Sequence, residues 1–574
     1  MATDDKYDRQ LRLWGAHGQR ALGQAKICFL VGEGSGALAT ETLKNLVLPG
    51  IGEFVIVDGA MVSERDLGSN FFVEGEALGQ SRADCCTRLL KELNPDVQGA
   101  FVAEPVAKVV EERPEYLHQF QAVIGCRLDD TLQLKVEDIC KAAGVPLVLQ
   151  NILGFLGQLR LCLQEHCVVE GKPDTDPVDL RILNPFPQLV ELVKKVDLSK
   201  MDDAQHAHVP YIFILMIALQ RWRDKNGDPT KEDSSGSAAD GGGKRFRSGE
   251  TISRTLTYPK TKEEKDDLKA ILGAMRRSPQ EANFDEAQSF IYQAWSPYRI
   301  PDGMQNAFGT IPSCAKNSES STSMSSAGYQ NRPAGAANGK GNPNPSADFW
   351  RLVAATKEFA SQNGGMLPLM GSLPDFVSDT ESYIALQQAY NAKAKEDRQS
   401  IRQLAGVGEG SEIDEEFLKR FCQFAMTVDV FRYRSLREEI SQPNEDTYQC
   451  ECGDEDAQMG PYIAMSCAAQ FAATNGRWPG QGDDANLAAD LTDLTTIQKE
   501  RFQSMSDYVS NVDRLGDYLK EVVRYGGSEL HPTAAFLGGV TSQEVVKIIT
   551  KQFTPLNNTF VYSGIFGKAQ TLEL

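Results

Sequence analysis

The sequence predicts a doubly wound α/β domain, Rossmann-like in design, that is interrupted by a large, mostly helical insertion. Short apolar strands alternate with helical patterns between residues 26 and 163, and one further helix and strand pattern closes the chain. Strict alternation indicates parallel pairing, because a parallel neighbour has to be reached through a crossover. The 574 residues are also too many for one compact core. We therefore expect more than one structural unit.

Five strands and three helices are expected in the first part of the chain. The strands cover residues 26–31, 54–57, 100–102, 122–125 and 146–150, and the helices lie near residues 37–48, 80–93 and 132–143. A sheet of this kind binds ligands at the carboxyl ends of its strands. The loop that follows Val31 is therefore the expected ligand position.

The end of the chain is expected to return to the same sheet. Residues 534–550 are apolar on nearly all faces, which indicates a buried helix, and residues 559–563 are typical of a strand. One helix and one strand do not form a core alone. The predicted organisation is a sheet-forming part at residues 1–165, a helical insertion at 166–525 and a closing part at 526–574.

The helical insertion contains two stretches of biased composition. Residues 226–250 and 316–347 bury too little apolar surface to offset their ordering entropy, so both are expected to be mobile loops. The first holds the basic run 244–247, which has the pattern of a localisation signal and equally that of a solubilising patch. Between the loops and the closing part, one helix is expected to start at Ser378, with Glu381 at the capping-box position.

Composition narrows the function classes. The net charge of -20 argues against nucleic-acid binding, because phosphate contacts need a concentrated positive surface. No apolar run reaches the ~18 residues of a membrane span, the first residues lack a signal-peptide pattern, and the twelve cysteines form no regular framework. We expect a reduced protein of the cytoplasm or nucleus that binds neither nucleic acid nor membrane.

A glycine-rich loop follows the first strand and has the pattern of a nucleotide cradle. Gly32 allows a tight turn, Gly34 lets the backbone approach a phosphate, and Gly36 precedes a helix whose amino terminus offers free N–H groups. Asp58 closes the second strand, where an acidic residue would hold a ribose hydroxyl. These residues predict a dinucleotide site, and a turn used only for close packing is the alternative.

Three segments resemble the ThiF/MoeB adenylation fold of ubiquitin-like-protein activating enzymes. They are residues 42–52 (TLKNLVLPGIG), 54–58 (FVIVD) and 536–547 (FLGGVTSQEVVK). In active members of that family, four groups of residues follow the glycine loop. They are an Asp after the loop, a D-x-x-N-x-x-R segment, a Lys on the next helix and an Asp after the fourth strand, and we call them the active set. Together these groups bind ATP and hold magnesium for nucleotidyl transfer.

The chain departs from this active set at most positions. Phe71 and Phe72 stand where the arginine of the segment should follow, and Arg82 replaces the Lys. Leu128 stands where the metal-binding Asp is expected, although Asp129 is one residue away and a gap would restore it. We therefore expect no functional nucleotide or metal site on this chain, with the glycine loop and its Asp kept as a vestigial frame.

An arginine before the first strand is the candidate catalytic residue. On the predicted helix, Tyr7, Leu11 and Trp14 share one face, so Arg9 points away from the face that anchors the helix. In activating enzymes built from two adenylation halves, the inactive half has a similar helix. The resemblance implies that Arg9 reaches the nucleotide in the partner's active half. An arginine paired with a surface carboxylate is the alternative.

No cysteine stands out as a thiol that would accept a modifier as a thioester. Cys450, Cys452 and Cys467 lack the spacing of common metal hairpins, so no metal site is expected there. His531 and Glu529 stand at the start of the closing helix. His531 is expected to cap that helix rather than to catalyse a reaction.

Over most of its length the chain resembles the regulatory subunits of the activating enzymes of the neddylation pathway. The resemblance implies a heterodimer with a catalytic subunit that holds ATP, magnesium and the active cysteine, and a NEDD-type ubiquitin-like modifier as the protein activated. Tyr211 and Phe359 are expected to contact the partner. An autonomous ThiF/MoeB-like adenylyltransferase, an NAD(P)-dependent oxidoreductase and a pure scaffold remain as alternatives.

Overall fold

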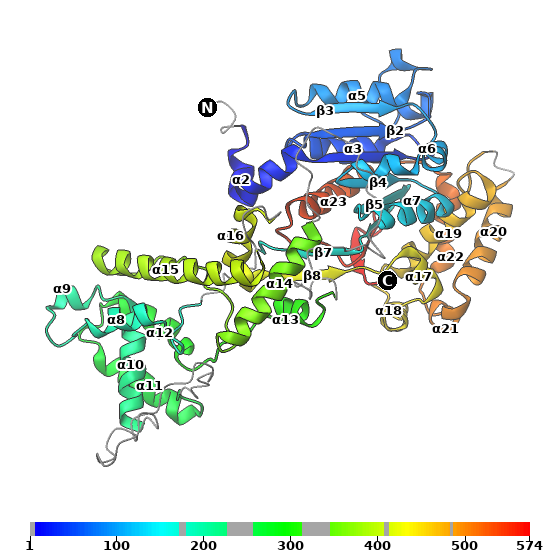
Figure 1. The fold of residues 1–574 in the computed structure, drawn as a ribbon. Helices are drawn as coiled ribbons and strands as arrows, with labels where there is room; N and C mark the ends of the chain where they lie inside the picture. Colours follow the sequence, from blue (N-terminus) through cyan, green and yellow to red (C-terminus); the bar gives the residue numbers. More distant parts are fainter. Residues whose placement is uncertain (1–5, 172–178, 227–256, 313–344, 407–412, 483–485) are drawn as a thin grey trace. The chain divides into compact units, whose positions relative to one another are not determined.

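The structure, a computed structural model, describes residues 6–171, 179–226, 257–312, 345–406, 413–482 and 486–574. It divides into two compact units (Figure 1). Unit 1 joins Met1–Val168 to Phe431–Leu574, and unit 2 is Val169–Val430. The two stretches of biased composition, with the basic run 244–247 inside the first, fall almost entirely outside the described residues.

Unit 1 is built on an eight-stranded sheet of order β10-β9-β6-β5-β4-β1-β2-β3. The parallel strands are β1 (Lys26–Val31), β2 (Glu53–Val57), β3 (Gln98–Val102), β4 (Ala122–Cys126) and β5 (Leu147–Leu153). The antiparallel strands are β6 (Leu156–Cys162), β9 (Thr559–Ser563) and β10 (Lys568–Leu572). The predicted fold class is confirmed, and β6 and β10 are additions that the sequence analysis did not name. The chain order reverses at β1, which is flanked by β2 and β4, and this is where such sheets bind ligands.

Helices cover both faces of this sheet (Figure 1). One face shares an apolar core with α2 (Asp8–Gln24), α3 (Ala37–Val47), α5 (Arg82–Glu92) and α23 (His531–Thr550). The other face packs against α6 (Val106–Glu112) and α7 (Asp130–Ala143), and then against α19 (Met459–Asn475). α20 (Leu487–Arg501) and α22 (Leu515–Tyr525) cover α19 from outside.

The chain re-enters unit 1 earlier than the sequence patterns indicated. The return was expected at residue 526, whereas unit 1 resumes at Phe431. The helices in between belong with the sheet because α19 is apolar on almost all sides and packs on β6 and β9. Helical periodicity identifies a buried helix without telling which core it enters. The shorter helices of this stretch are α17 (Leu436–Ser441), α18 (Glu445–Glu451) and α21 (Ser506–Val509).

Unit 2 is helical. Its helices are α8 (Pro187–Lys194), α9 (Asp203–His206), α10 (Tyr211–Asn226), α11 (Lys262–Met275), α12 (Ala282–Phe290), α13 (Asp302–Gly309), α14 (Pro345–Gln362), α15 (Thr380–Leu404) and α16 (Glu415–Gln423). The start of α15 was expected at Ser378, but the cap is Asp379, whose carboxylate accepts the N–H of Ser382 at 2.8 Å. Serine and aspartate both cap helices well, so the sequence pattern did not distinguish Ser378 from Asp379 as the cap.

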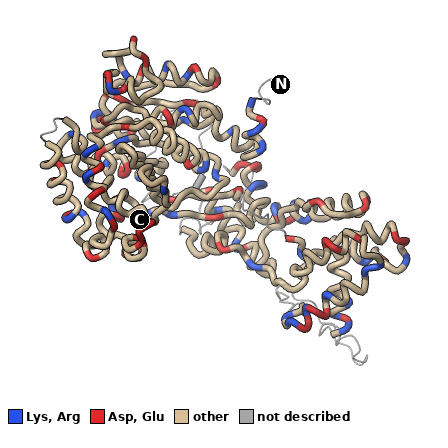
Figure 2. The backbone as a smooth tube through the Cα atoms, turned by 180° about the vertical axis from the view of Figure 1, so that it is seen from behind, with Lys and Arg blue, Asp and Glu red and all other residues tan. Residues whose placement is uncertain are grey.

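Along the chain, β7 (Glu165–Val168) ends just before unit 2 begins, and β8 (Asp429–Arg432) spans the boundary at which unit 2 ends. In both units, lysines and arginines are interspersed with aspartates and glutamates (Figure 2). Among the described helices, none combines the length and the apolar character that a membrane crossing needs.

Candidate functional site

The glycine loop lies at the carboxyl end of β1, in the position that the sequence predicted. Gly34 has a φ of 154° and Gly36 a φ of 73°, conformations that favour glycine. Gly36 is the N-cap residue of α3, so the first N–H groups of this helix are directed at the loop. Such a turn is the usual backbone geometry for binding an anionic phosphate.

The anion held by this loop is a side chain of the protein itself. Glu529 accepts the N–H of Ser35 through Oε1 at 2.9 Å and the N–H of Leu38 through Oε2 at 3.2 Å. A Cβ on Gly34 would lie 2.0 Å from Glu529 Oε1, so only glycine leaves room for the carboxylate. The Glu529 side chain is 1% exposed. Glu529 was expected at the start of the closing helix, and the structure instead places its carboxylate at the amino terminus of α3.

Arg127 holds the same carboxylate from the other side. Its Nε lies 3.2 Å from Glu529 Oε1 and donates to the carbonyl oxygen of Glu33 at 2.8 Å. Nη2 donates to the carbonyl oxygen of Gly527 at 3.0 Å, and the guanidinium lies 4.7 Å from the ring centroid of Trp478. Burial lowers the pKa of Arg127 from its ordinary value, while the Glu529 carboxylate opposes this shift. The loop therefore contains a buried, internally balanced ion pair.

Asp58, the predicted ribose ligand, is occupied as well. Arg82 donates to its two oxygens through Nε at 2.7 Å and Nη2 at 3.1 Å, and the Ala60 N–H donates to Oδ1 at 2.8 Å. Nη1 of Arg82 donates to the carbonyl oxygen of Gly34 and lies 3.4 Å from Asp66. Burial is the largest single effect and lowers the pKa of Arg82, but the charge and hydrogen bond of Asp58, together with the charges of Asp66 and Glu529, raise this pKa above its ordinary value. A ribose hydroxyl would have to displace this pair.

The segment that corresponds to D-x-x-N-x-x-R is used for packing. Asn70 donates from Nδ2 to the carbonyl oxygen of Ser35 at 2.9 Å and accepts from Thr40 Oγ1 at 3.0 Å. Phe72 is buried in the apolar core, whereas Phe71 is 76% exposed. Neither ring supplies a charge to the loop.

The turn after β4 offers no free carboxylate. Leu128 is buried among the apolar side chains beneath the sheet. Asp129 is the N-cap residue of α7, and its Oδ1 accepts the N–H of Leu132 at 3.0 Å. Even if a one-residue gap aligned Asp129 with the metal-binding Asp of the family, its carboxylate would have to give up the helix cap in order to bind a metal. Within the described ranges, no group of three or more His, Cys, Asp or Glu side chains is placed to hold a metal ion.

The described cysteines are mostly buried. Burial raises the pKa of Cys126, Cys140 and Cys467 to about 12, so these thiols stay protonated at neutral pH and are poor nucleophiles. Cys450, on α18, is the exposed one among the cysteines that the structure describes, and Cys452 beside it is buried. Cys314 lies outside the described residues.

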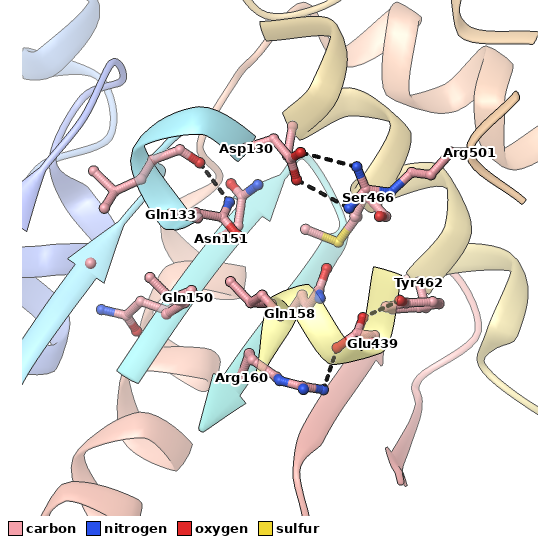
Figure 3. A pocket seen from close by; sticks show the side chains of 16 residues that line it. Asp130, Gln133, Gln150, Asn151, Gln158, Arg160, Glu439, Tyr462, Ser466 and Arg501 are labelled. Atoms are coloured by element: carbon pink, nitrogen blue, oxygen red, sulfur yellow. Dashed lines mark hydrogen bonds and ion pairs between the residues drawn. The ribbon is translucent and has the colours of Figure 1, made fainter. Parts of the chain in front are cut away.

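A second polar site lies on the other face of the sheet (Figure 3). Asp130 and Arg501 form a paired contact at 3.1 Å through both carboxylate oxygens, and Arg160 Nη1 lies 2.6 Å from Glu439. Tyr462 donates to the same glutamate through its hydroxyl. This network joins the sheet to α17, α19 and α20. Its charged side chains neutralise each other in pairs, so none of them is free to bind a substrate.

Arg9 lies on α2 and is exposed. Its side chain has no hydrogen-bond or ion-pair partner within the described part of the chain, whereas Arg12, on the same helix, pairs with Asp8 at 3.0 Å. The opposite face of the helix is anchored, since Trp14 packs against the core and the Tyr7 hydroxyl accepts from Asn94 at 3.1 Å. The helix thus presents Arg9 outward, in the orientation that the sequence predicted.

The two residues expected to contact a partner are core residues of unit 2. Tyr211 is 1% exposed and stacks on Phe290 with ring centroids 5.0 Å apart. Phe359 is 3% exposed and lines a cavity of about 180 Å³ with Phe186 and Met366. Their burial makes both rings contributors to the stability of unit 2, and a partner would reach them only after a rearrangement of this unit.

Three loop residues were not recognised as such from the sequence: Arg127, Trp478 and Glu529. None of them stands in a local motif for this role, and the role of each depends on contacts between distant segments. The signal that pointed to them was indirect. A buried glycine loop that lacks its family's charged ligands needs some other partner for its N–H groups, because unpaired buried donors are costly.

Comparisons with known proteins agree with this architecture. The chain matches the ThiF family over residues 7–574. It is 35% identical to the NEDD8-activating enzyme E1 regulatory subunit AXL of Arabidopsis thaliana, over 99% of each chain. It is also 35% identical to the NEDD8-activating enzyme E1 regulatory subunit of Danio rerio, over 100% of this chain and 99% of the relative. The Saccharomyces cerevisiae protein of that name is 26% identical over 99% of this chain and 100% of its own. The chain therefore belongs to the ThiF family and, within it, to the NEDD8-activating enzyme E1 regulatory subunits.

Proposed function

We propose that this chain is the non-catalytic half of a heterodimeric activating enzyme for NEDD8. A catalytic subunit supplies the ATP site, the magnesium and the active cysteine, adenylates the carboxyl terminus of NEDD8 and then captures it as a thioester. The observation that carries the proposal is the filled loop. Glu529 takes the position of a phosphate, and Arg82 takes up both oxygens of Asp58.

The part of this chain in the chemistry is Arg9. Its guanidinium is permanently charged and planar, and an anchored helix directs it away from the protein. Placed against the nucleotide of the catalytic subunit, it stabilises the negative charge that develops on the phosphates during nucleotidyl transfer. It acts from across the subunit interface.

A pyrophosphate-exchange assay tests the division of labour. The purified chain with NEDD8 and ATP should exchange no labelled pyrophosphate into ATP, and addition of the catalytic subunit should restore exchange. Exchange by the chain alone would identify an autonomous adenylyltransferase. A spectroscopic titration with NADH, followed by nicotinamide fluorescence, separates the oxidoreductase alternative, because the proposal expects no saturable binding.

A further inference from the structure

Unit 2 contains a cavity of about 180 Å³, formed where three of its helices meet. Phe186 and Pro187 line it from the start of α8, and Phe359 and Asn363 line it from the end of α14 and the residue that follows. The middle turns of α15 supply polar groups to the same cavity. The function proposed above assigns no role to it.

The walls of this cavity are apolar and fixed by packing. Phe186 and Phe359 are buried, and the Phe186 ring meets Tyr390 edge-on with centroids 5.1 Å apart. The Tyr390 hydroxyl donates to the carbonyl oxygen of Leu180 at 2.6 Å, which holds this wall in place. Pro187 is exposed, so the cavity opens to solvent beside α8. Since an apolar cavity of about 150 Å³ holds one benzene ring, this one has room for a single ring with a small substituent.

Arg181 directs one N–H group at a sulfur atom in the cavity. Its Nε donates to Asp179 at 2.7 Å and Nη2 to the carbonyl oxygen of Leu367 at 2.6 Å, whereas Nη1 donates to Sδ of Met366 at 2.9 Å. The Arg181 side chain is 8% exposed, and its φ of 54° is a strained conformation of the kind that is concentrated at ligand sites. A thioether is a weak acceptor, and a charged donor bonds oxygen more strongly. An oxygen atom in the cavity would therefore be a better partner for Nη1 than the sulfur is.

The charges at the cavity are balanced. Lys393 Nζ lies 2.7 Å from Oδ1 of Asp397, and Arg181 pairs with Asp179. A charged ligand would therefore bring a charge that has no counterpart there, and its burial would be costly. Asn184 also lines the cavity, and its carboxamide has no hydrogen-bond partner within the residues that the structure describes. Because a carboxamide both donates and accepts, it suits a neutral polar group.

We propose that this cavity binds a small neutral molecule that consists of one aromatic ring and a carbonyl group, as in an aromatic carboxamide. The ring lies against the walls formed by Phe186 and Phe359. The carbonyl oxygen accepts from Nη1 of Arg181 in place of the Met366 sulfur, and the Asn184 carboxamide bonds the remaining polar atoms. The site lies within unit 2 and is independent of the function proposed above.

Methyl NMR of the full chain, labelled with carbon-13 at the methionine methyl groups, tests the site with benzamide as the probe. The chain has thirteen methionines, few enough for the Met366 signal to be identified by its loss in Met366→Leu. The Met366 methyl signal should shift as benzamide saturates the cavity, with a Kd on the order of 1 mM, the affinity open to so small a ligand. Benzoate, which has the same ring and a negative charge, should bind more weakly by about tenfold or more.

A substitution that fills the cavity is the second test. Asn363→Phe adds a ring at a half-buried lining position and should abolish the benzamide shift. Asn391→Phe on α15 is the matched control. Both asparagines donate from Nδ2 to a carbonyl oxygen one helical turn earlier, at 2.8 and 2.9 Å, but Asn391 is exposed and does not line the cavity. Its affinity for benzamide should equal that of the wild type.

Thermal unfolding shows whether each variant is folded, and the comparison of benzamide with benzoate needs no variant at all. A Met366 methyl signal that shows no saturable shift with benzamide overturns the inference, and so does an unchanged shift in a folded Asn363→Phe variant. Benzoate that binds as tightly as benzamide overturns the neutral ligand class. None of these results bears on the proposed function, which the pyrophosphate-exchange assay tests separately.

Discussion

At the scale of single residues, the carboxylate of Glu529 decides what the glycine loop can bind. Its removal in Glu529→Ala would leave the N–H groups of Ser35 and Leu38 and the guanidinium of Arg127 facing an empty anion site. We expect a loss of stability of about 3–5 kcal/mol, because one partner of a buried ion pair is left alone. Inorganic phosphate should restore part of the melting temperature of this variant.

Differential scanning fluorimetry over a phosphate series measures this effect. The wild type should show no such recovery, since its loop is occupied. Glu33→Ala is the control: Glu33 is exposed and lies in the same loop, but its carboxylate contacts Gln481 rather than the N–H cradle. Equal phosphate responses in all three proteins would show that the loop is not a latent anion site.

Arg9 is the second residue whose charge carries a proposed role, the stabilisation of phosphate charge during adenylation. Arg9→Ala should slow adenylation of NEDD8 by the heterodimer on the order of a hundredfold, the usual effect of removing one donor from a developing negative charge. Subunit assembly should survive, because the anchoring face of α2 is untouched. The comparison is Arg12→Ala, which removes an arginine already paired with Asp8. Initial rates of pyrophosphate exchange measure both variants, and equal rates would exclude the proposed role.

At the scale of structural elements, the loop between α19 and α20 supports the filled site from behind. Arg477 forms a bidentate pair with Asp490 at 2.7 and 2.6 Å, and the Gly480 N–H donates to the same carboxylate at 2.7 Å. This fixes Trp478 beneath the Arg127 guanidinium. The hydrogen bond from Arg477 lowers the pKa of Asp490 from its ordinary value, against the effect of burial.

The lowered pKa gives a prediction for stability against pH. A carboxyl whose pKa is lower in the folded state stabilises the protein at pH values above its unfolded pKa of about 4, and this contribution is lost as the pH falls through the folded pKa. Asp490→Asn should therefore cost about 1–3 kcal/mol at neutral pH. The difference from wild type should shrink below about pH 4. Urea unfolding at several pH values measures it, and a difference independent of pH would contradict the assignment.

The elements that the sequence predicted well are those with a local signal. The parallel strands of unit 1 are short apolar runs between helices, and alternation alone fixed their pairing. β6 and β10 lacked that signal. β6 follows β5 after a two-residue turn, which hides the boundary, and β10 carries mostly small and polar side chains because one of its faces is uncovered. The orientation of Arg9 followed from helical periodicity, whereas the ion pair of Arg127 with Glu529 depends on contacts that no local pattern encodes.

At the scale of the whole molecule, the chain leaves its α/β unit after residue 168 and returns at residue 431. The inserted unit has an apolar core of its own, centred on α10, α11 and α12. The sequence predicted such an insertion from the change in pattern, and its carboxyl boundary was misplaced because α19 looks like any buried helix. Because one fold can serve different activities, the function proposed above rests on the residues of the site and not on the architecture.

The distance along the chain between the two parts of the filled loop has a consequence for biosynthesis. Ser35 and the carboxylate that it binds are 494 residues apart. During translation the glycine loop therefore leaves the ribosome long before Glu529 does, and contacts of such high sequence separation form late. Until then the nascent chain carries an open anion cradle and an arginine without its carboxylate. Synthesis of the carboxyl-terminal part of the chain supplies this carboxylate and closes the cradle.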